Sequence, residues 1–189
     1  DVDCFRFTAE AGQVISCEVI AGRLGSRLDP IVELLDSTGR KVEAELAHIG
    51  TDPVLIFWSK STAEYVFRIA NVTFGGDPAH VYRINIRPEP FPRMTLPGGV
   101  SRATLAANDL RVLRLTGDRG DLNEVLGLVL PQQATAANRW TVFEPMVWPL
   151  TLSIDEHSPG VEKEPNDENS ESQAIVVPRV LYGQFGSAK

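Results

Sequence analysis

The sequence predicts an all-β protein, made of a jelly-roll-like β-sandwich followed by a smaller immunoglobulin-like β domain. Three observations support this fold class. Short runs of β-branched and aromatic residues alternate between apolar and polar positions, which is typical of strands. Turn signals rich in Gly, Asp, Asn and Pro separate these runs at short intervals. No part of the chain shows the helical period of apolar residues.

The composition is that of a globular chain. Of its 189 residues, 43% are hydrophobic and 23% are charged, which is enough apolar material for one large core or two small ones. No apolar run approaches the roughly 18–20 residues of a membrane span, so we expect no membrane insertion. The net charge of −7, with no cluster of Lys and Arg, argues against a nucleic-acid partner. The chain starts at Asp1 rather than Met, so we expect a processed product or an excised piece.

We expect the first domain to cover residues 1–88. Alternation over residues 4–8 places Phe5 and Phe7 on one face of a strand, and alternation over residues 14–20 turns Ser16 and Glu18 outward. Further strands are predicted at 31–35, 41–46, 54–58, 65–69 and 82–86.

Cys4 and Cys17 fall on neighbouring predicted strands. In an oxidising compartment they would have the opportunity to form a disulfide; the alternative is two small buried or half-buried residues. Cys4 is in phase with polar neighbours and Cys17 with apolar ones, which puts them on opposite faces and favours free thiols.

The second domain is expected over residues 89–158, after a stiff proline-rich linker at residues 87–92. The third part, residues 159–189, begins with an acidic linker and ends with two short β segments at 173–178 and 180–185. Two strands alone cannot form a stable core, so these segments must pack on something else. The strands of the second domain are predicted at 110–115, 125–130, 139–143 and 148–154.

The acidic linker concentrates the charge of the chain. Seven acidic residues and one Lys lie between Asp155 and Glu171, so this stretch carries −6 of the net −7. In an extended chain the oxygen-bearing side chains of Glu162, Glu164 and Asn166 point the same way, and Asp167 follows. Such hard oxygen ligands suit Ca²⁺. The plainer alternative is a solvated interdomain linker.

Several motifs of residues 1–88 occur in an order that resembles the bacterial pre-peptidase C-terminal domain, as found in tandem in large secreted proteins of planctomycete-type bacteria. They are Asp-Val-Asp-Cys-Phe-Arg-Phe at 1–7, Arg-Leu-Gly-Ser-Arg-Leu-Asp-Pro at 23–30, Glu-Tyr-Val-Phe-Arg-Ile at 64–69, and Gly75-Gly76 followed by Tyr82-Arg83-Ile84. The family domain normally begins earlier, with a Glu-Pro-Asn-Asp motif and a strand containing Gly-x-Phe. Here those motifs stand at 164–167 and 183–185, near the other end of the chain.

The resemblance implies that residues 159–189 open a second copy of the domain. A second hypothesis is that they complete the first sandwich, in the same chain or in a neighbouring one. The resemblance, shared with the collagen-binding domains of clostridial collagenases, also implies Ca²⁺ binding. The implied ligands are Glu162, Glu164, Asn166 and Asp167, with Asp1 and Asp3 matching the later ligands of a preceding motif that this chain lacks.

No catalytic arrangement is recognisable, so we do not expect an enzyme. The three histidines are scattered, and there is no nucleophile elbow or phosphate-binding glycine loop. We expect a non-catalytic accessory or spacer module of a secreted, cell-surface or periplasmic bacterial protein, whose partners are neighbouring domains of the same protein. The alternative is an adhesion module for polysaccharide or extracellular protein, with Trp58 as a weak candidate for a stacking platform. For Trp58, Trp140 and Trp148, packing in the core is favoured over ligand binding.

Overall fold

The structure is a computed structural model and describes residues 1–96, 98–103, 106–117, 120, 122–129, 139–142, 150–157 and 159–183. These residues confirm the all-β prediction, since they contain strands and short 3₁₀ turns and no α-helix. The chain divides into two compact units. The first comprises Asp1–Phe91 and Arg114–Leu122, and the second comprises Pro92–Leu113 and Asn123–Lys189.

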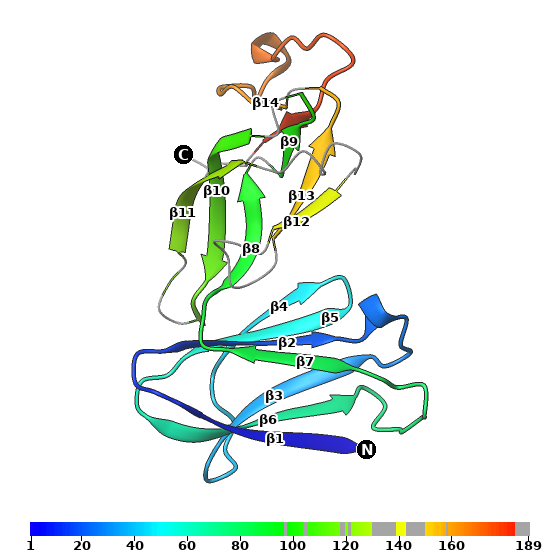
Figure 1. Cartoon of the computed structure of the whole chain (residues 1–189), viewed down its shortest axis with the longest axis vertical. Helices are drawn as coiled ribbons and strands as arrows, with labels where there is room; N and C mark the ends of the chain where they lie inside the picture. The colour runs from blue at the N-terminus through cyan, green and yellow to red at the C-terminus, as the bar shows by residue number, and fades with distance from the viewer. Residues whose placement is uncertain are drawn as a thin grey trace. The chain divides into compact units, whose positions relative to one another are not determined.

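Two antiparallel sheets form the first unit and lie as two layers (Figure 1). In the first sheet the strand order is β1-β6-β3, and in the second it is β4-β5-β2-β7. The strands are β1 (Val2–Ala9), β2 (Val14–Ile20), β3 (Pro30–Asp36), β4 (Glu45–Ile49), β5 (Asp52–Trp58), β6 (Ala63–Asn71) and β7 (Arg83–Arg87). All their pairings are antiparallel, and β1 and β7 are each at the edge of a sheet.

The core of this unit is built from the inward-facing residues of the two sheets. Phe57 and Phe67 are almost fully buried in it, and the Tyr65 ring packs 4.9 Å from the Phe57 ring and 6.0 Å from the Phe7 ring, measured between centroids. Burying a large apolar side chain contributes about 1.5–3 kcal/mol. Alternation along the strands therefore accounts for the layered fold, because it supplies one continuous apolar face to each sheet.

Most strands of the first unit lie where the sequence predicts them, but the prediction at 41–46 is confirmed only at its two ends, at the Lys41 bridge and at the start of β4. Residues after the Asp36–Gly39 turn stay on the first sheet only briefly, through a bridge between Lys41 and Leu35 and a bond from the Val42 N–H to the Leu34 carbonyl. The chain then crosses to the second sheet, where β4 begins at Glu45. The crossing interrupts what reads in the sequence as one strand.

The expectation that Ser16 and Glu18 face solvent is wrong. Both point away from the aromatic core, yet Ser16 is fully buried and Glu18 is only 4% exposed. The Ser16 hydroxyl donates to the Glu89 carbonyl at 2.6 Å. Their partners on β5 are fully buried as well: Val54 lies opposite Glu18, and Ile56 lies opposite Ser16. The second sheet is thus covered on both faces.

A segment distant in the sequence also approaches the second sheet. Residues Arg114–Leu122 belong to the first unit, although the sequence suggests that they lie inside the second domain. Gly117 in this segment has a φ of +69° and approaches β5 so closely that an added Cβ would lie 3.0 Å from the Phe57 Cα. Only a residue without a side chain fits such a backbone-to-backbone approach.

The two cysteines are not on neighbouring strands, contrary to the sequence-based expectation. Cys4 is exposed on β1 in the first sheet, Cys17 is buried on β2 in the second, and both are free thiols. Burial raises the pKa of the Cys17 thiol to about 12, so it stays protonated at neutral pH.

Three small sheets make up the described part of the second unit. Two have the strand orders β11-β10-β8 and β12-β13-β9, and their buried residues include Val100, Val112, Leu152 and Ile154. The strands are β8 (Phe91–Leu96), β9 (Gly99–Ser101), β10 (Ala106–Leu115), β11 (Leu122–Val129), β12 (Arg139–Val142) and β13 (Leu150–Asp155). The predicted strand residues 130, 143, 148 and 149 lie outside the described residues.

The third small sheet is the parallel pair β14 (Gly160–Val161) and β15 (Leu181–Tyr182). Between them, the predicted β segment at 173–178 is not a strand, because no neighbouring strand pairs with it among the described residues. The segment 180–185 is a strand at Leu181–Tyr182, and Gln184 and Phe185 lie outside the described residues. The tail therefore pairs with β14 of its own unit in these residues, and not with β1.

Candidate functional site

The candidate site is the open side of the first sandwich, between the edge strands β1 and β7. Among the described residues, β1 pairs only with β6 and β7 only with β2. The apolar space between the two sheets therefore reaches the surface here. Phe5, on the core-facing side of β1, stays 40% exposed. With Tyr82, Ile84 and Ile86 it lines a groove of about 360 Å³.

A small polar pocket of about 60 Å³ adjoins the groove, and Tyr82 lines both. The Tyr82 ring meets the Phe5 ring edge-on at 6.4 Å, and its hydroxyl donates to Asp3 Oδ2 at 2.5 Å. Burial, and then the neighbouring Asp3 carboxylate, raise the pKa of Tyr82, so the hydroxyl remains a donor at physiological pH. The Tyr82 side chain thus lies where the polar pocket meets the apolar groove.

The loop after β6 closes the polar pocket and is held by Asn71. This side chain is buried; its Oδ1 accepts a bond from the Asp29 N–H at 3.1 Å, and its Nδ2 donates to the Thr73 hydroxyl at 2.7 Å. The loop brings Asp77 and His80 to the pocket wall beside Asp1 and Asp3.

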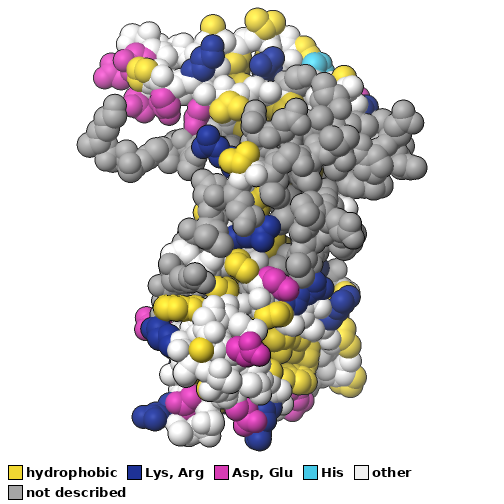
Figure 2. All heavy atoms as spheres, turned by 60° about the vertical axis from the view of Figure 1, so that its left-hand side comes forward, with side chains coloured by type: hydrophobic (Ala, Val, Ile, Leu, Met, Phe, Trp, Pro, Cys, Tyr) yellow, Lys and Arg dark blue, Asp and Glu magenta, His cyan; other side chains and the backbone are white. Residues whose placement is uncertain are grey.

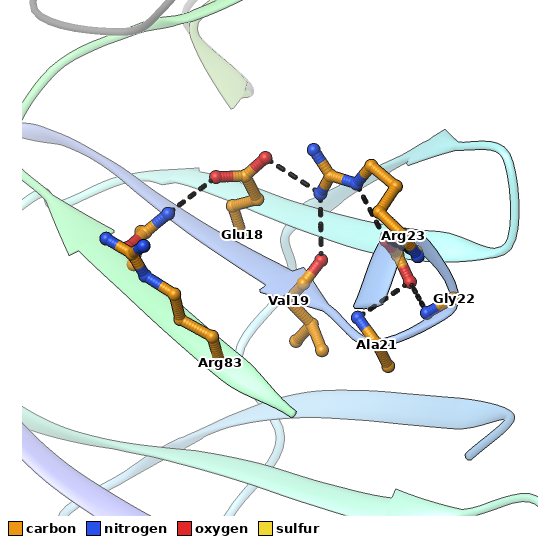
Figure 3. Close-up of polar contacts among 8 residues, drawn as sticks. Glu18, Val19, Ala21, Gly22, Arg23 and Arg83 are labelled. Carbon is orange, nitrogen blue, oxygen red and sulfur yellow. Dashed lines mark hydrogen bonds and ion pairs between the residues drawn. The ribbon is translucent and has the colours of Figure 1, made fainter. Parts of the chain in front are cut away.

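β7 presents different residues on its two faces. Ile84 and Ile86 line the groove, whereas Arg83 and Asn85 alternate with them and join a network on the opposite face (Figure 3). Asn85 Nδ2 donates to Glu18 Oε2 at 2.8 Å, across the Glu18–Asn85 strand pair. Arg83 Nε donates to Asn85 Oδ1 at 3.1 Å. These bonds hold β7 in register on β2.

Arg23 extends the network from Glu18 to Asp52. Its guanidinium lies 2.8 Å from Glu18 Oε1 and 2.7 Å from Asp52 Oδ2, and Nη2 also donates to the Val19 carbonyl (Figure 3). Asp52 is 1% exposed. A buried carboxylate needs such partners, because an unpaired charge in a low-dielectric interior is strongly destabilising.

Asp52 also binds the turn that carries Arg23. It accepts bonds from the backbone N–H groups of Ala21, Gly22 and Arg23 at 3.0, 2.6 and 3.2 Å. Burial alone would raise the pKa of Asp52, but the bonds from Arg23 and from the three N–H groups outweigh it and hold the pKa below its ordinary value. A Cβ on Gly22 would lie too close to the Thr51 hydroxyl, so a larger residue here would displace the Thr51 side chain.

This network lies outside the set of site residues that the sequence suggests. In the sequence, Gly22 and Gly25 read as ordinary turn residues, and Glu18 reads as a solvent-facing strand residue. The available signal is a charged residue at the centre of a strongly apolar strand, together with an Asp immediately before Pro53 at the start of β5. That signal does not name the partner, because Arg23 and Asp52 meet only through the fold.

The calcium candidates belong to both units: Asp1 and Asp3 to the first, and Glu162, Glu164, Asn166 and Asp167 to the second. Glu162 is half-buried with its carboxylate against Gly183, Asn166 is half-buried, and Glu164 and Asp167 are exposed. Glu164 Oε2 accepts the Asn166 N–H at 3.1 Å. Acidic side chains gather at the end of the second unit formed by this loop (Figure 2).

Asp1 and Asp3, the other two candidates, line the polar pocket of the first unit. In the part of the chain that the structure describes, no three His, Cys, Asp or Glu side chains form a group able to hold a metal ion. Calcium binding stays a prediction.

Residues 160–183, called the acidic loop below, are held at both ends by hydrogen bonds. Beyond the two backbone bonds between β14 and β15, the Tyr182 hydroxyl donates to Asp155 Oδ2 at 3.1 Å. The Tyr182 ring lies on Gly98 and Gly99: a Cβ on Gly99 would be 2.8 Å from the Tyr182 oxygen and 2.6 Å from the Ser153 carbonyl. Residues 160–183 thus form a closed loop on the second unit.

Trp58 is half-buried on β5, and its ring nitrogen is buried. It therefore does not offer the flat exposed face that sugar stacking requires. The Trp140 side chain and the whole of Trp148 lie outside the described residues.

Comparisons with family models, curated proteins and solved structures find no significant match for this chain. Within the described ranges, no helix has the length and apolar character needed to cross a membrane.

Replacing Asp52 tests the network. We expect Asp52→Asn to lower the free energy of unfolding by about 2 kcal/mol, because it weakens a charge-assisted bond to Arg23 and bonds from three backbone N–H groups. Glu43→Gln, which neutralises an exposed carboxylate, should change it by less than about 0.5 kcal/mol. Equal effects of the two substitutions in urea denaturation would show that the network does not stabilise the unit.

Wild type and Asp52→Asn, compared over a range of pH, test the pH dependence of the Asp52 contribution to stability. Because the pKa of Asp52 is lower in the folded state, its contribution to stability is complete above the unfolded value of about 3.9 and is lost as the pH falls through the folded value. The difference in unfolding free energy between wild type and Asp52→Asn should therefore be constant from about pH 7 to pH 5 and shrink below about pH 4. A difference that is unchanged at pH 2 would contradict this.

Proposed function

We propose that this chain is a non-catalytic accessory module of a secreted or cell-surface bacterial protein, and that it connects and spaces neighbouring domains. The observation that carries the proposal is the open side of the first sandwich. There an unpaired strand edge and an apolar groove lie together, lined by Phe5, Tyr82, Ile84 and Ile86. The resemblance to pre-peptidase C-terminal domains supports the same function and the same extracellular location.

An open edge of this kind needs a cover. Exposed strand edges next to apolar surface promote unwanted association, and proteins generally pair, charge or cover them. β1 is eight residues long and is not protected by a proline or a bulge. A neighbouring domain that lies against β1 would complete the sandwich and fix the spacing between the two domains.

The construction of the chain also suits a connector. The chain passes between the two units at Phe91–Pro92, at Leu113–Arg114 and at Leu122–Asn123, so three covalent links join the units. The adhesion alternative depends on an exposed aromatic platform, and the half-buried Trp58 does not support it. We therefore propose a neighbouring domain, and not a polysaccharide, as the partner.

Calcium remains part of the proposal in a restricted form. The acidic loop supplies oxygen ligands, but they do not converge in the described residues, so further ligands would have to come from a neighbouring domain. We expect 5 mM Ca²⁺ to leave the melting temperature of this chain unchanged and to raise that of a longer protein containing the following domain, relative to EDTA. Glu164→Gln should abolish the rise, and Glu43→Gln should not. No rise in the longer protein would refute the calcium prediction.

Hydrogen–deuterium exchange tests the connector function. In this chain alone, we expect alternate amides of β1 to exchange rapidly, because only β6 pairs with this strand, whereas amides of β6 exchange slowly between two neighbours. In the longer protein, the fast amides of β1 should become protected while those of β6 change little. Equal exchange of β1 in both proteins would overturn the proposal that a neighbouring domain covers this edge.

A further inference from the structure

The acidic loop exposes an apolar segment that has no partner within the described residues. Val176 and Val177 are 86% and 79% exposed, and Ile175 is exposed as well. In the part of the chain that the structure describes, residues 174–177 form no backbone hydrogen bond. Soluble proteins rarely leave three consecutive branched apolar residues in water without a binding role.

The sequence of this segment is typical of a β-strand, although the segment pairs with no strand among the described residues. Residues 172–178 carry no charge, the run Ala174–Val177 is apolar on both faces, and Pro178 ends it. Gln173 Oε1 accepts the Lys163 N–H at 2.9 Å, which anchors the start of the segment to the loop. Extended, residues 173–177 would span about 16 Å, enough to lie along the middle of β1.

The first unit carries the matching acceptor. A strand added to the free edge of β1 would direct every second side chain over the groove of Phe5, Tyr82, Ile84 and Ile86. None of these four side chains is charged, so branched apolar side chains would cover them without desolvating an ion.

Charge determines the direction of the added strand. The exposed Arg179 follows the apolar segment, and the carboxylates of Asp1 and Asp3 lie at the start of β1. If the segment runs antiparallel to β1, Arg179 comes to this acidic end while Val176 and Val177 lie near Phe5. A parallel arrangement would place Glu171 there instead and set like charges together.

We propose that residues 173–177 of one copy of this chain add as an antiparallel strand to β1 of a second copy. This inference rests on the proposed function and names the neighbour that covers the open edge. Each copy has one donor segment and one acceptor edge, so the contact is head-to-tail and extends into chains of copies. A five-residue strand buries far less than the ~1,200 Å² of a stable complex, so separate copies associate weakly and a covalent trap is needed to detect them.

The natural thiol of Cys4 supplies that trap, since it is exposed on β1, while Cys17 is buried. In Val176→Cys, mild oxidation should link Cys4 of one copy to the introduced thiol of another and give a ladder of dimers, trimers and larger species. Ser170→Cys is the matched control, because position 170 is exposed in the same loop but outside the apolar segment. We expect Val176→Cys to cross-link at least about tenfold faster than Ser170→Cys, a factor that corresponds to about 1.4 kcal/mol.

Two further variants test the mechanism. Adding Cys4→Ser to Val176→Cys should abolish the ladder. Adding Arg179→Glu should slow cross-linking at least about threefold, whereas Lys163→Glu, with the same charge change at another exposed position of the loop, should have a smaller effect.

Three outcomes would overturn the inference: equal cross-linking of Val176→Cys and Ser170→Cys, links between two introduced thiols only, or a link between Cys4 and the introduced thiol within one monomer. If β1 is nevertheless protected from exchange in the longer protein, the connector function stands and a different neighbour covers the edge. If β1 remains unprotected there, the connector function itself fails.

Discussion

The arrangement of the first unit depends on the need to compensate two carboxylates that are buried on the outer face of its second sheet. Glu18 and Asp52 are almost inaccessible to water, and they share one arginine, Arg23. Each also has neutral donors: Asn85 for Glu18, and three backbone N–H groups for Asp52. Taken singly, the bonds are ordinary, but together they connect β2, β5, β7 and the turn after β2. The buried charges stabilise this set of strands only as long as all the donors are in place.

This network fixes the register of β7 and thereby decides which side chains of β7 line the groove. Asn85 and Arg83 face the network, and Ile84, Ile86 and Tyr82 face the open side of the sandwich. A slip of β7 by one residue would exchange the two sets, which would bury arginine in the groove and expose isoleucine. The Glu18–Asn85 bond therefore defines the register in which the groove is apolar. Its polar end is determined separately, by Tyr82 and Asp3.

Alternation predicts the strands that carry Phe5, Phe7 and Phe67, and a continuous apolar run predicts the strand that carries Phe57, because both patterns are local properties of the sequence. What these patterns miss depends on the rest of the chain. Glu18 reads as a surface residue because a sequence shows polarity but not whether a second layer covers that face. The segment Arg114–Leu122 belongs to the first unit, and its Gly117 approaches the β5 backbone, although it is far away in the sequence. The crossing before β4 falls at Glu43-Ala44-Glu45, residues of low β propensity that weaken the strand prediction at 41–46.

The C-terminal part shows the opposite limit. The concentration of charge between Asp155 and Glu171 is obvious in the sequence, and a calcium site is the natural hypothesis, since alternate oxygen ligands share one side of an extended chain. In the structure this segment belongs to a loop closed by Tyr182 and Asp155, and no three of the described His, Cys, Asp or Glu side chains form a group able to hold a metal ion.

The acidic loop contains the exposed apolar segment of residues 173–177. Five acidic and two basic residues give the loop of residues 160–183 a net charge of −3, which favours its solvation. In this loop the apolar side chains of Ile175, Val176 and Val177 are exposed. A weak five-residue strand then becomes useful when donor and acceptor are linked in one long protein, because tethering raises the effective concentration to the millimolar range. In that setting the affinity of a single contact matters less than its register, which the apolar groove of one module and the closed loop of the next would define together.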